Sequence, residues 1–295
     1  MRVDEVMVIK CGGRAASDFA PLAADIAASV AGGRHVVIVH GGSADIDSLG
    51  ARLGVPMRRM TSADGLSARM TDAATLEVVT LALAGSVQPR LVSSLLAAGV
   101  PAVGLTGIDG GLLRAQRRVT QRAVVDGRRV VERGDHSGRI TGVRTELLGC
   151  LLAAGFVPVV CPPVLAEDGA PVNADADQAA AAIAGALGAS TLLLLTAAPG
   201  VLRDPDDANS AMATCEVPPA GPPPQRGGGM GVKLIAARAA LAAGVPRVLI
   251  ADGRVEQPVS RALAGSATEV VLADCAGSEG RPPGTPREVV EAVPR

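Results

Sequence analysis

The sequence predicts an α/β protein with an open, mainly parallel sheet between two layers of helices. Two observations predict this fold. Short, continuously apolar segments rich in β-branched residues recur along the chain, as expected for parallel strands buried on both faces. Ala- and Leu-rich helical stretches alternate with them, which indicates repeated βαβ units.

The strand candidates share this apolar, β-branched character: Val6–Ile9, His35–Val39, Ala102–Leu105, Val157–Cys161, Thr191–Leu195, Arg247–Ala251 and Thr268–Leu272. The helix candidates share helical periodicity: Pro21–Ala31, Ala44–Leu53, Asp72–Ala84, Ser86–Ala98, Arg144–Ala154, Asp177–Leu187 and Val232–Ala243. The segment from Leu112 to Gly138 interrupts the alternation and predicts an antiparallel insertion. In it, Asp126-Gly127 predicts a hairpin turn between Ala123–Val125 and Arg128–Glu132.

A division of the chain near Leu165 is predicted, with one half over residues 1–165 and a second over residues 166–273. Within the second half, Asp204 to Arg226 is rich in Pro, Asp and Ala and predicts a surface excursion. Residues 274–295 are rich in Gly, Pro, Glu and Arg, which predicts a disordered tail.

The composition argues against several functional classes. A net charge of -1, with no Trp, no Tyr and two Phe, disfavours nucleic-acid binding. Five scattered cysteines without C-x-x-C spacing predict free thiols in a reducing cytoplasm. The two long uncharged stretches, 147–166 and 178–202, are broken by Gly and Pro, so we expect no membrane span.

Lysine is rare, because 26 of the 28 basic residues are arginine. The two exceptions lie beside glycines, in Lys10-Cys11-Gly12-Gly13 and in Gly229-Met230-Gly231-Val232-Lys233. Lysine presents a compact ammonium, and glycine lets backbone N–H groups approach an anion closely. The alternative is that compositional drift spared two lysines by chance, but their shared glycine context favours a phosphate site closed from two sides.

Two further motifs carry polar residues at predicted helix starts. In Asn173-Ala174-Asp175-Ala176-Asp177, Asp177 is explained as a helix cap, which leaves Asp175 free to hold an ammonium or a metal. Before another helix start, Arg69 is positioned to fork onto a carboxylate. Neither G-x-x-x-x-G-K-[ST] nor a G-x-G-x-x-G turn after the first strand is present, so the common nucleotide motifs are excluded.

Six motifs in order resemble the amino acid kinase family, over about residues 5 to 272: Lys10-x-Gly12-Gly13, His40-Gly41-Gly42, Arg69-Met70-Thr71-Asp72, Gly104-Leu105-Thr106-Gly107-x-Asp109-Gly110, Asn173-Ala174-Asp175 and Gly229-Met230-x-x-Lys233. The resemblance is to the acetylglutamate kinase branch, and it implies a three-layer α/β/α fold and phosphorylation of a side-chain carboxylate with MgATP. Two positions depart from the pattern of this branch. Pro171 replaces the first Asn of the usual N-x-N-A-D motif, and Ala197 replaces the Asp that usually follows the Thr or Ser of the later glycine turn.

The segment Arg133-Gly134-Asp135-His136-Ser137-Gly138 resembles the RGDYTG stretch of kinases that act on aminoadipate or glutamate carried by a small acidic amino-group carrier protein (LysW type). From Leu112 to Arg144, nine arginines and three acidic residues give a local charge of +6, which would attract such a partner. We therefore expect Arg117, Arg118, Arg128 and Arg129 to bind it. A solvated arginine-rich hairpin, or contacts to ATP phosphates, is the alternative.

The resemblance implies a role for each matched residue. Lys10, Lys233 and Asp175 would be catalytic, with Asp175 orienting both ammoniums. Gly41, Gly42, Arg69 and Asn173 would bind the amino-acid substrate. The nucleotide would contact Gly12, Gly13, Ala197, Ala198, Pro199, Gly200, Val201, Leu202, Gln225, Arg226, Gly227 and Met230. Mg²⁺ would be held mainly by phosphates, without a protein metal site, and a homodimer is expected. Two alternatives remain open, a free acetylglutamate kinase of arginine synthesis and a non-catalytic amino-acid-binding regulator on the same fold.

Overall fold

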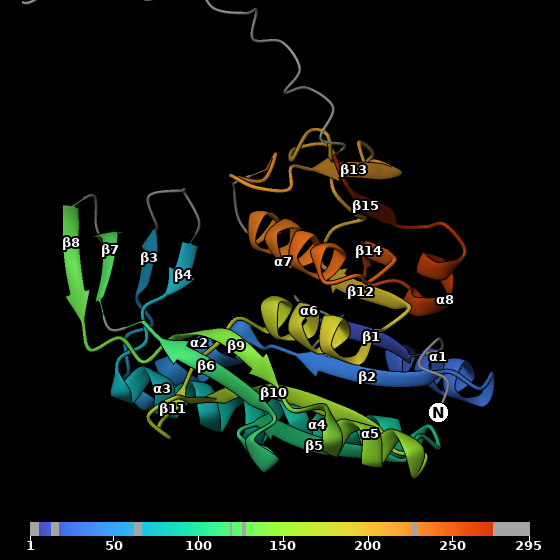
Figure 1. Ribbon diagram of the computed structural model, residues 1–295, viewed down its shortest axis with the longest axis horizontal. Helices are drawn as coiled ribbons and strands as arrows, with labels where there is room; N and C mark the ends of the chain where they lie inside the picture. The colour runs from blue at the N-terminus through green and yellow to red at the C-terminus, as the bar shows by residue number, and fades with distance from the viewer. Residues whose placement is uncertain are drawn as a thin grey trace, which may run out of the picture.

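The computed structural model describes residues 6–12, 18–61, 67–118, 120–125, 128–225 and 229–273, with the backbone alone for 61, 120–125 and 128–133. Its centre is an 11-stranded sheet in the order β13-β15-β14-β12-β1-β2-β10-β6-β9, with β5 and β11 also paired to β10 (Figure 1). The predicted α/β architecture with a mainly parallel sheet is confirmed.

The strands of this sheet are β1 (Val6–Cys11), β2 (His35–His40), β5 (Ala102–Gly107), β6 (Leu113–Arg117), β9 (Gly138–Val143), β10 (Val157–Ala166), β11 (Pro171–Val172), β12 (Thr191–Thr196), β13 (Thr214–Val217), β14 (Arg247–Asp252) and β15 (Thr268–Leu272). The central strands β14, β12, β1, β2 and β10 are parallel to one another. Antiparallel pairs occur towards the edges, between β14 and β15 and between β6 and β9.

Helices cover both faces of the sheet, because every central strand buries both sets of its alternating side chains. On one face, Val6 and Val8 of β1 belong to a core shared with α5 (Thr145–Ala153), α6 (Ala176–Leu187) and α7 (Met230–Ala242). On the other, Met7 and Ile9 belong to a core shared with α1 (Ala20–Ala31), α3 (Ala73–Ala82), α4 (Gln88–Ala97) and α8 (Pro258–Leu263). Two further helical elements are α2 (Ser43–Leu53) and the short 3₁₀ turn η4 (Asp109–Gly111).

The two helices predicted over 72–84 and 86–98 are one continuous helical stretch. A π-helical segment, η3 (Leu83–Val87), joins α3 to α4. By length and composition alone, Ala73–Ala97 could cross a membrane. It packs instead against α1, α2, β5 and β10, with Leu83, Val87, Leu91 and Leu95 fully buried or nearly so, as in the core helix of a globular domain.

A second sheet of four strands stands apart from the main sheet at the left of Figure 1. Its order is β4-β3-β7-β8, with β3 (Arg59–Thr61), β4 (Ser67–Arg69), β7 (Thr120–Val125) and β8 (Arg128–Arg133). The predicted hairpin strands are confirmed as β7 and β8, and the turn Asp126-Gly127 lies outside the described residues. The sequence reasoning missed β3 and β4, because three-residue strands leave almost no periodicity to detect.

Asp25 joins the first helix of the chain to the last one. Its buried carboxylate accepts hydrogen bonds from the backbone N–H of Val259 (2.6 Å) and Ser260 (3.0 Å), and from the Ser260 hydroxyl. These N–H groups belong to the first turn of α8, so a side chain of α1 caps a helix that lies 234 residues later. One carboxylate therefore links the first helix of the described chain to its last helix.

We expect Asp25→Ala to lower the free energy of unfolding by about 2–4 kcal/mol, because it removes a helix cap and leaves buried N–H groups without an acceptor. Asp25→Asn keeps one acceptor oxygen and should lose less. Urea denaturation of both variants provides the measurement. A loss below about 0.5 kcal/mol in Asp25→Ala, the usual range of surface substitutions, would show that the bond network is dispensable.

Candidate active site

The two lysines of the chain meet on one carboxylate. Lys10 Nζ lies 2.9 Å from Asp177 Oδ1, and Lys233 Nζ lies 3.0 Å from Asp177 Oδ2 and 3.2 Å from Oδ1. All three side chains are buried, with at most 8% of each residue exposed. The sequence-based prediction that both lysines face one site is therefore consistent with the geometry, although 223 residues separate them.

Three elements bring these groups together. Lys10 is near the carboxyl end of β1, Asp177 is in the first turn of α6, and Lys233 is in the first turn of α7. Helices α6 and α7 pack against each other over this end of the sheet. Carboxyl ends of parallel strands and adjoining helix N-termini are where anionic ligands bind in open α/β sheets.

The mutual contacts control the charge states. Burial acts to raise the pKa of Asp177, but the two ammoniums outweigh it and hold that pKa below its usual range. Burial acts to lower the pKa of Lys10, yet the carboxylates of Asp177 and Asp175 raise it above the ordinary value. The pKa of Lys233 is lowered, because burial and the ammonium of Lys10 outweigh Asp177. At neutral pH, Lys10 is a cation and Asp177 an anion.

The roles expected of Asp175 and Asp177 are exchanged in the structure. Asp175 is the N-cap of α6, and its Oδ1 accepts from the backbone N–H of Asp177 (2.9 Å) and Gln178 (3.0 Å). The expectation that Asp175 holds both ammoniums is corrected, since the direct ion pairs belong to Asp177. Asp175 lies close enough for its charge to act on both lysines. The N-x-N-A-D pattern fits better two residues later, with Asn173 first, Asp175 in place of the second Asn, and Asp177 last.

Gly12 is required by the position of the lysine. A Cβ at this residue would lie 2.4 Å from Lys10 Nζ and 3.2 Å from the carbonyl oxygen of Leu195. The next glycine of the motif, Gly13, lies outside the described residues. Gly42 is similarly constrained, with its Cβ position 2.9 Å from Leu83 and 3.0 Å from Val87 of the π-helical segment, whereas Gly41 would meet ordinary contacts.

Two buried groups beside Lys10 are electrically neutral at pH 7. Burial raises the pKa of the Cys11 thiol to about 12, so this cysteine is not a nucleophile. Burial lowers the pKa of His40 to about 4. Its Nδ1 is 3.1 Å from the carbonyl oxygen of Gly41, while its Nε2 is buried without a hydrogen-bond partner among the described residues. Lys10 thus keeps its charge among neutral neighbours on its own strand and on β2.

The segment Gly134–Gly138 ties the predicted substrate residue Asn173 to Thr71, two residues after Arg69. The buried carboxylate of Asp135 accepts from the backbone N–H of Thr71 (3.2 Å) and from the Ser137 hydroxyl (2.6 Å). His136 donates its backbone N–H to Thr71 O (2.6 Å) and accepts from the backbone N–H of Asn173 (2.7 Å). The Asn173 amide also donates to the Thr71 hydroxyl at 3.3 Å. The sequence indicates only the resemblance of this segment to the carrier-dependent kinases and does not reveal its structural role.

Arg69 ends β4 with its guanidinium 2.7 Å from Asp47 and 3.2 Å from the Ser43 hydroxyl, at the first turn of α2. That turn directly follows Gly41 and Gly42, so the structure brings Arg69 to the glycine turn as the sequence predicts. In contrast, the described contacts of the Gly104–Gly110 motif are made within the motif and with the neighbouring strand β10. Asp109 accepts from the Thr106 backbone (2.6 Å) and hydroxyl (3.0 Å), and Gly107 packs against Val164.

Apart from Gly12, the predicted nucleotide residues that the structure describes lie in a loop after β12 and in the described ends of a second loop before α7. The first, Ala197–Leu202, follows β12 and is held by Thr268, whose hydroxyl accepts from the backbone N–H of Val201 (2.9 Å). The second loop is described as far as Gln225, whose side-chain amide donates a hydrogen bond to the carbonyl of Leu202. Met230 begins α7 next to Lys233, and Arg226 and Gly227 lie outside the described residues. The two loops thus adjoin the helix that carries one of the lysines.

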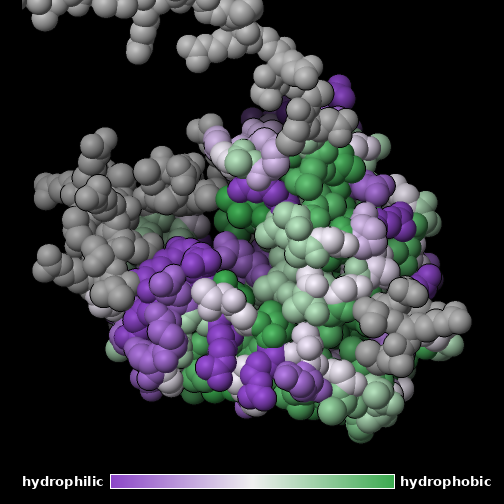
Figure 2. Space-filling view, viewed as in Figure 1, coloured by the Kyte–Doolittle hydropathy of each residue, from purple (hydrophilic) through white to green (hydrophobic). Residues whose placement is uncertain are grey.

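The four arginines expected to bind a carrier do not form one cluster. Arg117 and Arg118 lie at the end of β6, where Arg117 also pairs with Asp168 (3.7 Å). The backbone of Arg128 and Arg129 begins β8 at the far end of the β7–β8 hairpin, six residues from its base and so about 20 Å away. Figure 2 shows hydrophilic surface where β6 and β9 lie in Figure 1.

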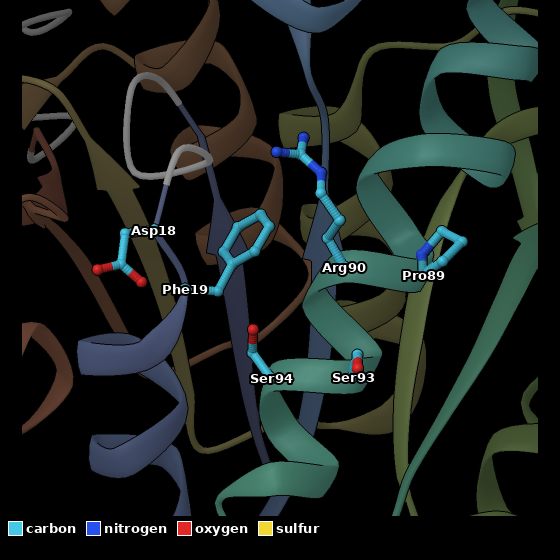
Figure 3. Close-up of a pocket in the computed structure, with 6 residues that line it drawn as sticks. All are labelled: Asp18, Phe19, Pro89, Arg90, Ser93 and Ser94. Carbon is cyan, nitrogen blue, oxygen red and sulfur yellow. The ribbon is translucent and has the colours of Figure 1, made fainter.

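Two surface cavities lie away from the lysines. One, of about 490 Å³, is an open hollow between α1 and α4, lined by Asp18, Phe19, Pro89, Arg90, Ser93 and Ser94 (Figure 3). Another, of about 190 Å³, lies near His35 and Phe156. Within the described ranges, no cluster of His, Cys, Asp or Glu has the composition of a metal site.

Two buried lysines at the carboxyl edge of an open α/β sheet have the geometry to neutralise phosphate groups, as a phosphotransferase requires. The comparisons with known proteins agree: residues 5–252 match the family model for the amino acid kinase family. The chain belongs to this family.

Curated relatives cover most of the chain. The [LysW]-aminoadipate kinase of Deinococcus radiodurans is 38% identical over 92% of this chain and 93% of its own. The [LysW]-aminoadipate kinase of Thermus thermophilus is 38% identical over 90% of this chain and all of its own. The acetylglutamate kinase of Symbiobacterium thermophilum is 40% identical over 85% of each chain.

Solved structures share the fold. The N-acetylglutamate synthase of Neisseria gonorrhoeae superposes with a TM-score of 0.70 and 26% identity, over 92% of this chain and 60% of that one. The carbamate kinase of Giardia superposes with a TM-score of 0.61 at 18% identity, over 92% and 99% of the two chains. The protein is an amino acid kinase, and the family implies the use of ATP.

We expect Gly12→Ala to fold normally and to lose about 10²–10³-fold in kcat, because the new methyl displaces the Lys10 ammonium. The matched control is Gly149→Ala in α5, where a Cβ would meet nothing within 4 Å. Steady-state phosphotransfer at saturating ATP, with circular dichroism for folding, checks both. Full activity of Gly12→Ala would mean that the position of Lys10 does not matter for transfer.

Proposed function

We propose that this protein uses MgATP to phosphorylate the side-chain carboxylate of an N-blocked acidic amino acid carried by a small acidic carrier protein, with 2-aminoadipate or glutamate as the carried group. The observation that carries the chemistry is the buried Lys10–Asp177–Lys233 cluster. The curated relatives named [LysW]-aminoadipate kinase support the carrier. We place the enzyme in the cytoplasm and expect a homodimer, which light scattering of the purified protein can test.

In the proposed reaction, an oxygen of the acceptor carboxylate attacks the γ-phosphorus of ATP. A new P–O bond forms, the bond from the γ-phosphorus to the β,γ-bridging oxygen breaks, and ADP leaves with that electron pair. The product is an acyl phosphate. Such transfers depend on positioning and on neutralising charge more than on covalent chemistry by the protein. Bound Mg²⁺ would neutralise phosphate charge and be held mainly by phosphate oxygens.

The protein's own groups have distinct proposed tasks. Lys10, which stays protonated, neutralises the phosphoryl group in transfer, and Lys233 the ADP side. Asp177 holds both ammoniums at fixed positions before the substrates arrive, and such preorganised charge is effective in a buried site. Gly41, Gly42, Arg69 and Asn173 orient the acceptor, and the loops 197–202 and 225–230 receive the nucleotide.

A free N-acetyl-L-glutamate kinase is the second candidate, since acetylglutamate kinases are 40–41% identical to the chain. The resemblance of Arg133–Gly138 to the carrier-dependent kinases and the cationic surface around β6 favour the carrier. Arg114, Arg118 and Arg139 are exposed on β6 and β9 or next to them. The non-catalytic regulator is disfavoured, because both lysines and the aspartate that joins them are in place.

We expect Lys10→Arg, Lys233→Arg and Asp177→Asn each to reduce kcat by about 10²–10³-fold, because each disturbs one preorganised charge in the site. Asp175→Asn should stay within about tenfold of the wild type, since an asparagine oxygen can still cap α6. Turnover at saturating MgATP distinguishes the two aspartates. If Asp175→Asn loses more activity than Asp177→Asn, the exchange of roles described above is wrong.

Activity on a carrier-bound acceptor can be distinguished from activity on a free acceptor by its dependence on ionic strength and on the surface charge of the enzyme. For the carrier-bound substrate, kcat/KM should fall steeply as ionic strength rises past 0.15 M, where the Debye length is about 8 Å. Neutralising Arg117 with Arg118, or Arg128 with Arg129, should raise its KM and leave the KM for ATP unchanged. Free N-acetyl-L-glutamate should respond to neither change.

The control neutralises Arg34, which follows α1, together with Arg261 of α8. This double variant removes the same amount of positive charge as each arginine pair above. Efficient phosphorylation of N-acetyl-L-glutamate that is insensitive to all of these variants, with no turnover of the carrier-bound form, would establish the free-acceptor kinase instead.

A further inference from the structure

The loop between β13 and α7 is built of residues that cannot fix its shape by themselves. Its described part, residues 218–225, which we call the strap, contains neither helix nor strand. Proline has no backbone N–H to donate and pairs poorly in helices and sheets. Five of the eight strap residues are proline: Pro218, Pro219, Pro222, Pro223 and Pro224. No hydrogen bond joins two backbone groups within this described segment, so its shape depends on contacts with other elements.

Arg238 of α7 joins two points of the strap. Its Nη1 donates to the carbonyl oxygens of Pro218 (3.3 Å) and Gly221 (2.6 Å), which are three residues apart. A tight turn often closes this spacing with a hydrogen bond between its own backbone groups. Here a guanidinium from another element joins the two positions instead. Gly221, with φ of 83°, supplies the left-handed backbone that the bend requires.

The far end of the strap is joined to the first of the two loops assigned to the nucleotide. The side-chain amide of Gln225 donates to the carbonyl of Leu202, the last residue of loop 197–202. Pro223 is buried between the two anchors. The strap is thus fixed near both ends and in its middle, and it connects α7, the helix that carries Lys233, to loop 197–202.

We propose that Arg238 is a positioning residue for the nucleotide. It holds the strap against α7, and the strap holds loop 197–202 through Gln225, so both loops have their binding arrangement before ATP arrives. This inference rests on the proposed function, which assigns these loops to the nucleotide, and it adds a residue that lies outside the motifs of the sequence. Without Arg238, only the fraction of molecules with an ordered strap can bind, and the apparent affinity falls by that fraction.

Direct nucleotide binding tests this role without any acceptor. Arg238→Met keeps an apolar side chain of similar reach and removes the donors. Calorimetric titration with Mg²⁺ and the non-hydrolysable β,γ-imido analogue of ATP should show about tenfold weaker binding than in the wild type, the usual effect of losing a hydrogen bond or two. Arg238→Lys should restore part of the affinity, because an ammonium can donate to the same carbonyls.

Steady-state phosphotransfer should show the same division. In Arg238→Met, KM for ATP should rise about tenfold while kcat at saturating ATP stays within about threefold, because Arg238 lies more than one helical turn beyond Lys233. Circular dichroism checks folding. If Arg238→Met does not fold, Arg238→Lys and Gln225→Leu carry the test, each with weaker nucleotide binding expected.

Arg247→Met is the matched control. Arg247 is also half-buried and also donates to a backbone carbonyl, that of Leu263 (3.4 Å), but it begins β14 at the opposite edge of the sheet from the lysines. This variant should bind the nucleotide analogue as the wild type does. The double variant of Arg238→Met and Gln225→Leu should lose less affinity than the product of the two single effects, because both residues act on one strap.

Wild-type affinity in Arg238→Met, equal losses in Arg238→Met and Arg247→Met, or a lower kcat with unchanged KM for ATP would overturn the proposal. A double variant that loses the full product of the single effects would overturn the connection through the strap. If nucleotide affinity changes as expected but no acceptor carboxylate is phosphorylated, the proposed function fails and the positioning role stands. If phosphoryl transfer occurs and Arg238→Met binds nucleotide normally, the function stands and the positioning role fails.

Discussion

The bridge from Asp177 to two lysines is the interaction on which the rest of the site depends. Two ammoniums repel each other strongly when buried, and each would lose hydration without a partner. One carboxylate offsets part of both costs and holds the two ammoniums at a fixed distance from each other. The strand order places Lys10 at the centre of the sheet, and the packing of α6 on α7 then brings in Asp177 and Lys233. The helix start at Asp175 fixes where the carboxylate points.

Most of the main sheet could be predicted from the sequence, because its strands are buried on both faces and read as continuous apolar runs. The order of the strands could not, since it depends on contacts between distant residues. In the second sheet, the sequence predicts β7 and β8 but not β3 and β4. These two strands have three residues each and carry Arg, Thr and Ser, so they show no hydrophobic periodicity.

The sequence predicts the cationic residues of the candidate site but not the aspartates that pair with them. Two lysines among 26 arginines are conspicuous, but aspartates are common, and spacing alone does not say which of Asp175 and Asp177 caps the helix. The cap falls to whichever residue has extended backbone at the helix start, which is Asp175 with φ −72° and ψ 129°. Asp47 was overlooked for a different reason, because its partner Arg59 lies on a strand that the sequence does not reveal.

The scarcity of lysine has a chemical consequence beyond charge. An acyl phosphate acylates free amines, and ε-amino groups are the most abundant amines of ordinary proteins. This sequence contains two, and both are buried and engaged by Asp177. Guanidinium groups, protonated far above neutral pH, do not react in this way. An enzyme that makes such a product therefore presents almost no surface amine to it, and mass mapping of lysine acylation after prolonged turnover would reveal whether the chain is spared.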